Sequence, residues 1–328
     1  MRSPRLTPIA TVAALSVLTM TLASACSGSS TSTASATSKL EKTNLVVGTV
    51  PAEANMPIYV AEVRGIFAAH GLHVKIVSIT STAQTVPDLE HGTFDIAGGQ
   101  LTTWIAAQSK GLGQFKVLAP GVEIGANVNE IMALKSSGIT SPADLKGKTI
   151  AVNALSGDGV LLTDALLTAY GIKPNQVTLT AMGFPDMAAA LLAHRVAAVY
   201  MTQPYDTEVE QQDGATVVAD LNEGAAQNML LGGFTVTAQW AAKYPHTAAA
   251  FTAAIKEASE VTDTNLSAAQ KAAEVYLKAS PKVADVMAFG TAPTSVPLEK
   301  LNQLADLMHE FGELTPANYD VAPLIAKS

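Results

Sequence analysis

Past Lys42 the sequence alternates between short β-branched runs and amphipathic runs of helix length. The strand-like runs of the first series lie at 45–50, 73–79, 94–97 and 115–119. Glycines mark the boundaries, since Gly71 stops the first helical run and Gly98-Gly99 end the third strand. An alternating order of strands and helices predicts a parallel sheet with helices on both faces. This part of the chain is therefore constrained to an α/β fold.

A second series of the same kind begins near Glu130, and only helical patterns follow Trp240. The expected strands of this series lie at 131–135, 149–152, 177–181, 197–201 and 216–219, with an extended segment at 230–236. The expected helices of the tail lie at 245–262, 267–279, 282–289 and 298–312. Two α/β units followed by helices predict a chain of two lobes.

We expect a discontinuous first lobe, built from 44–128 and 236–328 and including the C-terminal helices, and a second lobe over 129–235. Ligands of open α/β sheets bind beyond the carboxyl ends of the strands. In a two-lobed chain those ends face each other, so a ligand cleft is expected between the lobes.

The first 42 residues predict an export signal and a tether. Residues 1–25 combine the positive charges of Arg2 and Arg5 with an apolar stretch too short to span a bilayer comfortably. Leu-Ala-Ser-Ala-Cys at 22–26 resembles a bacterial lipobox, in which the chain is cleaved before the cysteine and Cys26 is acylated. An ordinary cleavage site with an incidental cysteine is the alternative.

Residues 27–38 contain only Ser, Thr, Gly and Ala, so 26–42 is expected to be a lipidated cysteine followed by a flexible linker. The expected location is the extracytoplasmic side of a bacterial cell membrane, with lipid as the anchor.

Composition excludes several other classes of protein. The net charge is −8, from 20 Lys and Arg against 28 Asp and Glu, which is unfavourable for binding nucleic acid. One cysteine excludes a disulfide within the chain and any cysteine-rich metal site. The six histidines match no metal-site spacing, and no nucleophile elbow or phosphate-binding loop is present. We therefore expect neither an enzyme nor a bound cofactor or metal.

Four sequence blocks occur in a characteristic order: 56–74, 92–97, 143–152 and 184–205. They include Met-Pro-Ile-Tyr-Val-Ala, Gly-Thr-Phe-Asp-Ile-Ala, Asp-Leu-Lys-Gly-Lys-Thr-Ile-Ala-Val and Phe-Pro-Asp-Met. Together they resemble the periplasmic-binding-protein type II family of ABC-importer substrate-binding proteins. The resemblance covers about residues 44–320 and is strongest to the branch that binds alkanesulfonates, taurine, nitrate and thiamine precursors.

The resemblance implies capture of a small molecule by closure of the cleft and delivery to an ABC permease with its ATPase subunits. It implies a monomer that performs no chemistry. Two alternatives stay open: a sensor or adaptor lipoprotein without transport, and an exported enzyme like the pyrimidine synthases that share this fold. The lipobox argues against the enzyme, because a tethered extracytoplasmic protein is badly placed for biosynthesis.

Candidate ligand contacts follow the strands. Glu53, Asn55 and Met56 lie between the first strand and its helix, where free amides could donate to a ligand. Asn55 could equally be only a helix cap. Gln100 follows the paired glycines and can both donate and accept hydrogen bonds. Trp104 could stack on a ring or belong to the core.

Further candidates come from the crossing between lobes and from the second lobe. Asn127 and Asn129 lie at the expected first crossing, where the alternative is a hinge role. The turn Ser156-Gly157-Asp158 is the strongest candidate, because it opens a helix and resembles the serine-containing turn that meets the ligand in the family.

The segment Gln203-Pro204-Tyr205 stands where the family often has Glu-Pro-Tyr or Glu-Pro-Phe, so the loss of a carboxylate there could change ligand preference. A second departure is His194-Arg195-Val196-Ala197-Ala198, where the family usually has Gly-Arg-Val-Asp-Ala.

Charge also bears on the ligand. After the leader, the only arginines are Arg64 and Arg195, and both fall in surface-like positions. A bidentate arginine clamp on an anion is therefore not expected. A zwitterion such as taurine or a neutral nitrogen heterocycle fits at least as well as a sulfonate, and Asp158 would favour an amine or a ring N–H if it faces the cleft.

Overall fold

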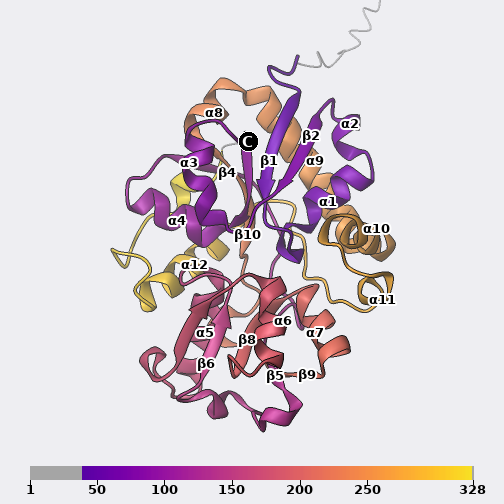
Figure 1. The fold of residues 1–328 in the computed structure, drawn as a ribbon. Helices are drawn as coiled ribbons and strands as arrows, with labels where there is room; N and C mark the ends of the chain where they lie inside the picture. Colours follow the sequence, from indigo (N-terminus) through magenta and orange to yellow (C-terminus); the bar gives the residue numbers. More distant parts are fainter. Residues whose placement is uncertain (1–38, 327–328) are drawn as a thin grey trace, which may run out of the picture. The chain divides into compact units, whose positions relative to one another are not determined.

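Two separate five-stranded sheets organise the chain in the computed structural model, which describes residues 39–326 (Figure 1). The predicted leader, Cys26 and most of the linker lie outside the described residues. The first sheet has the order β2-β1-β3-β10-β4 and the second β7-β6-β8-β5-β9. The described residues belong to one unit by their contacts, and the predicted two-lobed α/β fold is confirmed.

The first sheet is parallel through β2, β1 and β3 and mixed beyond them, because β10 runs antiparallel to both β3 and β4. Its strands are β1 (Asn44–Thr49), β2 (His73–Ser78), β3 (Ile96–Gln100), β4 (Phe115–Pro120) and β10 (Gly232–Thr237).

In the second sheet, β5 runs antiparallel to β8 and β9, whereas β6 is parallel to β7 and β8. The strands are β5 (Asn129–Leu134), β6 (Thr149–Val152), β7 (Thr178–Ala181), β8 (Ala198–Thr202) and β9 (Ala215–Asp220).

The expectation of purely parallel sheets was wrong. The strands β5 and β10 enter their sheets directly from the other lobe, so they arrive from the cleft side and run against their neighbours. Residues 232–235, expected in the second lobe, pair with β3 and β4 and therefore lie in the first sheet.

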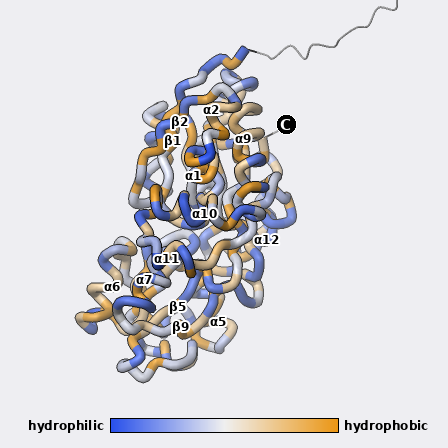
Figure 2. The backbone as a smooth tube through the Cα atoms, turned by 90° about the vertical axis from the view of Figure 1, so that its right-hand side faces the viewer, coloured by the Kyte–Doolittle hydropathy of each residue, from blue (hydrophilic) through white to orange (hydrophobic). Residues whose placement is uncertain are grey.

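Helices cover both sheets. The α-helices are α1 (Met56–Val63), α2 (Ile66–Ala69), α3 (Thr85–Glu90), α4 (Leu101–Ser109), α5 (Asp158–Ala169), α6 (Phe184–Leu192), α7 (Tyr205–Asp213), α8 (Ala238–Lys243), α9 (Pro245–Thr264), α10 (Leu266–Ala272), α11 (Pro281–Ala284) and α12 (Leu298–Glu310). A π-helical turn, η7 (Ala273–Leu277), follows α10. Figure 2 shows α1, α2, α9 and α10 gathered beside the strands β1 and β2 of the first sheet.

Three local differences from the sequence prediction have simple causes. The first helical run, which Gly71 ends, is not one helix: it is interrupted at Gly65, whose φ of 70° is left-handed, so α1 and α2 are separate. Gly98 and Gly99 lie inside β3 instead of ending it. Residues at the end of the expected linker are packed on the body, because Glu41 accepts a hydrogen bond from the Thr247 amide at 2.9 Å.

Two apolar cores hold the described residues together. One, which includes Ile58, Phe67 and Phe251, lies between the first sheet and the helices α1, α2 and α9. The other runs from α4 and β4 through α12 into the whole second lobe. The helix α12 packs on both α4 and α5, so it joins the two lobes on one flank. Among the described helices, none is both long and apolar enough to cross a membrane.

Candidate functional site

A pocket lies where the carboxyl ends of strands from both sheets meet. Val50 follows β1, Gln100 ends β3, Asn153 follows β6 and Thr202 ends β8, and all four line the pocket. The other polar and aromatic side chains of the lining are Asn55, Ser81, Thr82, Asn129, Asp158, Phe184 and Tyr200. Its cavity volume is about 50 Å³. That volume admits a few water molecules, so the cleft is nearly closed in this conformation.

Four side-chain amides belong to the polar lining: those of Asn55, Gln100, Asn129 and Asn153. Asn55 donates from Nδ2 to the Val50 carbonyl at 2.9 Å, while Asn129 accepts from the Tyr200 hydroxyl at 2.7 Å. The Oδ1 atoms of Asn55 and Asn153 are buried and have no hydrogen-bond partner among the described residues. A buried acceptor without a donor is unfavourable by about 1–3 kcal/mol, so these two oxygens are suited to donors on a ligand.

One carboxylate belongs to the lining. Asp158 begins α5 and is 4% exposed, and its Oδ1 accepts a hydrogen bond from the Thr102 hydroxyl of α4 at 2.8 Å. Burial, together with the nearby carboxylate of Glu313, raises the pKa of Asp158 to about 7. The Thr102 bond joins α4 of the first lobe directly to α5 of the second.

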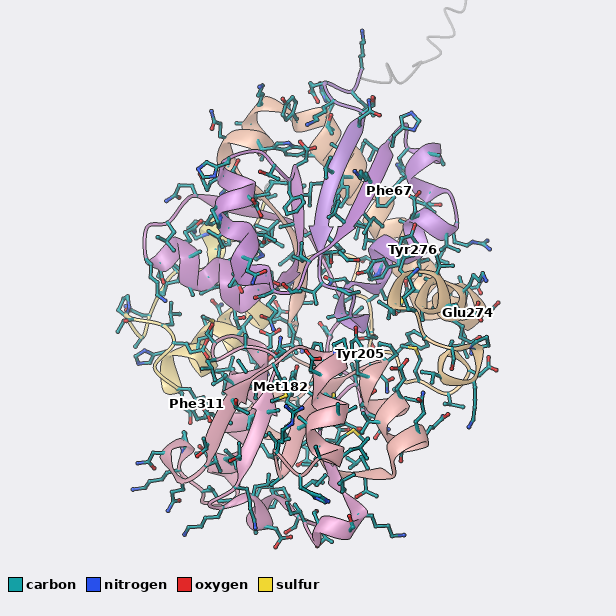
Figure 3. The ribbon with its side chains drawn as sticks, in the orientation of Figure 1. Phe67, Met182, Tyr205, Glu274, Tyr276 and Phe311 are labelled. Atoms are coloured by element: carbon teal, nitrogen blue, oxygen red, sulfur yellow. The ribbon has the colours of Figure 1, made fainter. Side chains whose placement is uncertain are left out.

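An aromatic wall closes the pocket on the second-lobe side. Phe184 stacks on Tyr205 with ring centroids 5.1 Å apart and lies tilted against Tyr200 at 6.1 Å. Tyr205 stacks on Phe184 without lining the pocket itself, and Figure 3 labels Tyr205 at the end of the second lobe that faces the first. A flat ring face beside side-chain amides suits a planar polar solute.

The site has no positive charge of its own. Among the described residues that line the pocket, none is a lysine, arginine, histidine or cysteine. The side-chain amide of Asn55 and the hydroxyl of Tyr200 already donate within the protein, while the Oδ1 atoms of Asn55 and Asn153 accept from no described residue.

The glycines of β3 shape the opposite wall. A Cβ at Gly99 would collide with the side chain of Thr82, and one at Gly98 would meet Phe234 and Thr49. The Thr82 hydroxyl in turn accepts a hydrogen bond from the Gln100 amide at 3.1 Å. The paired glycines therefore permit close packing inside a strand and do not form a turn.

Four of the twelve predicted ligand contacts lie in the pocket: Asn55, Gln100, Asn129 and Asp158. Gly157 abuts Gln100, and Ser156 is exposed next to it. Met56 is fully buried. Trp104 is buried in the core, tilted against Phe115 at 5.1 Å, because its position in α4 faces the sheet.

Glu53, Asn127 and Gln203 lie at the crossing between the lobes. Gln203 donates from Nε2 to the Asn127 carbonyl at 2.9 Å, and its own carbonyl accepts from the Glu53 amide at 3.4 Å. The carboxylate of Glu53 is buried and accepts from the Gly290 amide at 2.7 Å. Burial raises the pKa of Glu53 to about 8. These residues hold the hinge together instead of lining the pocket.

Several lining residues were not anticipated. Tyr200 lies in a strand whose apolar neighbours made it look like core. Thr82 begins a short 3-10 helix, η2 (Thr82–Gln84), whose sequence has no distinguishing pattern. Phe184 is the first residue of the sequence block at 184–205, so the resemblance to the family could have identified it as a candidate. Asn153 directly follows β6, and the rule that ligands meet strand ends could have identified it.

A second hollow lies on the outer flank between α5 and α12. Its lining is mostly apolar, with Leu162, Leu307 and Phe311 among it, and carries the carboxylates of Glu223 and Glu310. It lacks the converging amides of the cleft, so the cleft is the better candidate for a polar solute.

Comparison with known proteins places the chain in a family. Residues 53–265 match the NMT1/THI5-like family. The chain belongs to this family. Among curated relatives, the NMT1/THI5-like chain is 26% identical over 144 residues to the 4-amino-5-hydroxymethyl-2-methylpyrimidine phosphate synthase THI11 of Saccharomyces cerevisiae, covering 44% of this chain and 41% of the relative. It is 28% identical over 163 residues to the formylaminopyrimidine-binding protein of Halalkalibacterium halodurans, covering 50% and 48%.

The chain thus spans less than half the length of the first curated relatives that it matches. Solved structures show the same fold. The alkanesulfonate-binding protein SsuA of Xanthomonas axonopodis, bound to MOPS, has a TM-score of 0.73 at 18% identity, with 88% of this chain and 100% of that chain covered. The nitrate-binding protein NrtA of Synechocystis has a TM-score of 0.72 at 16% identity, with 85% and 84% covered. The periplasmic-binding-protein fold expected from the sequence is thereby confirmed.

Proposed function

We propose that this chain is the solute-binding component of an ABC importer. The observation that carries the proposal is the pocket lined by strand ends of both sheets. A solute held there contacts both lobes and therefore stabilises the closed arrangement over an open one. The names of the formylaminopyrimidine-, alkanesulfonate- and nitrate-binding relatives support a role in solute capture.

Closure is the step that signals capture. The pocket is nearly filled by protein in this conformation, so a solute enters when the lobes are apart. The two crossing segments lie side by side, since Glu123 bridges Leu230 and the Ile124 amide donates to the Met229 carbonyl at 2.9 Å. A paired hinge of this kind lets the lobes rotate without unfolding either sheet. The closed form would then dock on a permease whose ATPase subunits drive release inward.

The cargo class follows from the polarity of the lining. A sulfonate would enter a pocket without a cation and would face the Asp158 carboxylate. A neutral or cationic nitrogen heterocycle would donate N–H groups to Asp158 and to the orphaned amide oxygens of Asn55 and Asn153. Its ring could lie along Phe184. Of the two cargo classes expected from the sequence, the lining therefore favours the aminopyrimidine precursors of thiamine over sulfonates and taurine.

A binding panel tests this function on residues 39–328, which contain both sheets and both cores. The panel holds 4-amino-5-hydroxymethyl-2-methylpyrimidine, its formylamino relative, taurine, ethanesulfonate and nitrate. A solute at 100 times its Kd adds about 2.7 kcal/mol to the free energy of unfolding. We expect a Tm rise of several degrees with the aminopyrimidines. No response to any of the five, with an empty pocket by native mass spectrometry, would contradict solute capture of this class and favour an adaptor role.

The proposed location and partners follow from the leader. Cleavage before Cys26 and acylation of its thiol would tether a monomer outside the cytoplasmic membrane, beside its permease, with no role in nucleic-acid binding. Growth with a labelled fatty acid tests the tether. Label should enter the wild-type protein and be absent from a Cys26→Ser variant.

A synthase is the second candidate, because the first curated relatives are named as pyrimidine phosphate synthases. The pocket offers no lysine for a Schiff base, and the lining carries no histidine or cysteine among the described residues. Product formation from the purified protein, abolished by an Asp158→Asn change, would favour the synthase over the binding protein.

A further inference from the structure

The start of α5 is occupied by a carboxylate from a distant part of the chain. Glu313 follows α12, and its Oε2 accepts a hydrogen bond from the Gly157 amide at 3.3 Å. The turn that carries Glu313 is fixed, because its amide donates to the Met308 carbonyl at 2.8 Å and the preceding Gly312 has a φ of 77°. The contact therefore comes from a defined position and not from a free tail.

The position that Glu313 occupies is one that favours a negative charge. Gly157 is the N-cap of a 12-residue helix, with φ 85° and ψ −160°, so its amide points out of the helix start. Free amides and the helix dipole at such a start attract anions. Gly157 also abuts the Gln100 side chain of the pocket lining. An anionic solute at this flank of the cleft would compete with the Glu313 carboxylate for the hydrogen bond from the Gly157 amide.

A second negative group stands at the same helix start. The Asp158 carboxylate is buried there and is held by Thr102. The two acids affect each other, since Glu313 raises the pKa of Asp158. Burial and the carboxylate of Asp164 raise the pKa of Glu313, while Lys110 and the Gly157 amide lower it.

We propose that Glu313 is a specificity-determining residue that excludes anionic solutes from the cleft, by occupying the helix-start amide with the protein's own carboxylate. The inference rests on the proposed solute-binding function and deepens it. A sulfonate or nitrate loses the amide and meets negative charge, whereas a solute that offers N–H donors is unaffected. The chain keeps the fold of the alkanesulfonate- and nitrate-binding proteins, while Glu313, a residue beyond α12, changes the class of solute that the cleft binds.

Removing the Glu313 carboxylate should increase the affinity of the cleft for small anions such as ethanesulfonate. We expect the Glu313→Gln variant, which loses the charge, to bind ethanesulfonate more tightly than wild type. The Glu313→Ala variant also frees the amide, so it should bind more tightly still, by about tenfold over wild type. Isothermal titration with ethanesulfonate, methanesulfonate and nitrate measures the order. Glu310→Gln is the matched control, because Glu310 is an exposed carboxylate three residues earlier.

The result that overturns the inference is a wild-type protein that binds ethanesulfonate as tightly as either Glu313 variant does, with all three folded by Tm and circular dichroism. An equal gain in Glu310→Gln also overturns it, because the effect would then be one of net charge. Aminopyrimidine titrations run in parallel separate the two proposals. A sulfonate gain without aminopyrimidine binding contradicts the proposed cargo and leaves the role of Glu313 standing.

Discussion

At the scale of single residues, the site depends on polar atoms that the protein leaves without partners. The Oδ1 atoms of Asn55 and Asn153 are orphaned and buried among the described residues, and Asp158 has one oxygen engaged by Thr102. Such acceptors are tolerated when a ligand supplies donors on closure. The proposed preference for a nitrogen-bearing solute rests on these three acceptors.

Asp158→Asn should weaken aminopyrimidine binding. The change keeps an oxygen for the Thr102 hydroxyl but removes the charge that accepts ligand N–H groups. Hydrogen bonds to charged groups contribute about 1.5–3 kcal/mol, so we expect Kd to rise by about tenfold or more. Titration calorimetry measures the change. Asp186→Asn is the control, since Asp186 is an exposed acid in the first turn of α6. Equal Kd values for wild type and Asp158→Asn would show that Asp158 does not face the ligand.

Gly99→Ala should destabilise the fold and disturb the pocket. Its Cβ would collide with Thr82, and overpacking of this kind is unfavourable by about 1–3 kcal/mol. Adding Thr82→Ala removes the collision, so the double variant should recover part of the loss in urea unfolding. Additive losses in the two single variants and the double variant would mean that the glycine serves some other purpose.

At the scale of elements, the sequence predicted where the strands lie along the chain better than which strands pair and in which direction. The runs at 149–152 and 115–119 became β6 and β4 with little change, because β-branched residues favour strands locally. The antiparallel placement of β10 was not predictable in this way. Its neighbours β3 and β4 lie more than a hundred residues earlier in the chain. The composition of β10 does not indicate whether it runs parallel or antiparallel to them.

The candidate site was predictable where it followed a strand end. Gln100 and Asp158, which line the pocket, were expected there because they follow strands, whereas Asn129, which also lines it, was expected at the crossing between the lobes. Tyr200 was missed, since a tyrosine within a strand looks the same whether its hydroxyl meets Asn129 or solvent. Glu313 lies more than 150 residues from Gly157, so their contact was outside the reach of any local pattern.

The helix α12 should stabilise both lobes together. Leu304 is fully buried in the core that runs from α4 through α12 into the second lobe. Leu304→Ala should lower the free energy of unfolding by about 2–5 kcal/mol, as large-to-small core changes do. Urea unfolding followed by tryptophan fluorescence measures the loss. Asp306→Ala is the exposed control on the same helix. A loss for Leu304→Ala no greater than for the control would mean that α12 contributes little to the joint core.

At the scale of the whole molecule, buried acids gather around the hinge and the cleft. Burial raises the pKa of Glu53 to about 8 and those of Glu130 and Asp158 to about 7. Further carboxylates act on all three: Asp220 and Glu210 raise the pKa of Glu130, Asp263 raises that of Glu53, and Glu313 raises that of Asp158. The folded chain therefore holds protons at neutral pH that the unfolded chain has already lost.

This distribution predicts that stability falls as pH rises. An acid whose pKa is raised on folding stabilises the folded state fully below its unfolded pKa, near 4, and loses that contribution as pH rises through the folded value. The window is about pH 4 to pH 8 for Glu53 and about pH 4 to pH 7 for Asp158. Glu41 acts in the opposite sense, because its pKa is lowered to about 2, so its contribution is lost only below pH 4.5. We therefore expect a higher Tm at pH 5 than at pH 8.

Glu53→Gln tests the cause of that slope. The glutamine oxygen can still accept the Gly290 amide but carries no proton to lose, so the fall in Tm between pH 5 and pH 8 should flatten. Glu90→Gln is the control, because Glu90 is exposed and should leave the slope as it is. The hinge position of Glu53 adds a second consequence. If ionisation loosens the crossing that Glu53 and Gln203 hold, ligand-free protein should expand at pH 8 in small-angle scattering, while Glu53→Gln stays compact at both pH values. A slope unchanged by Glu53→Gln would place the titrating groups elsewhere, with Asp158 and Glu130 next to be tested.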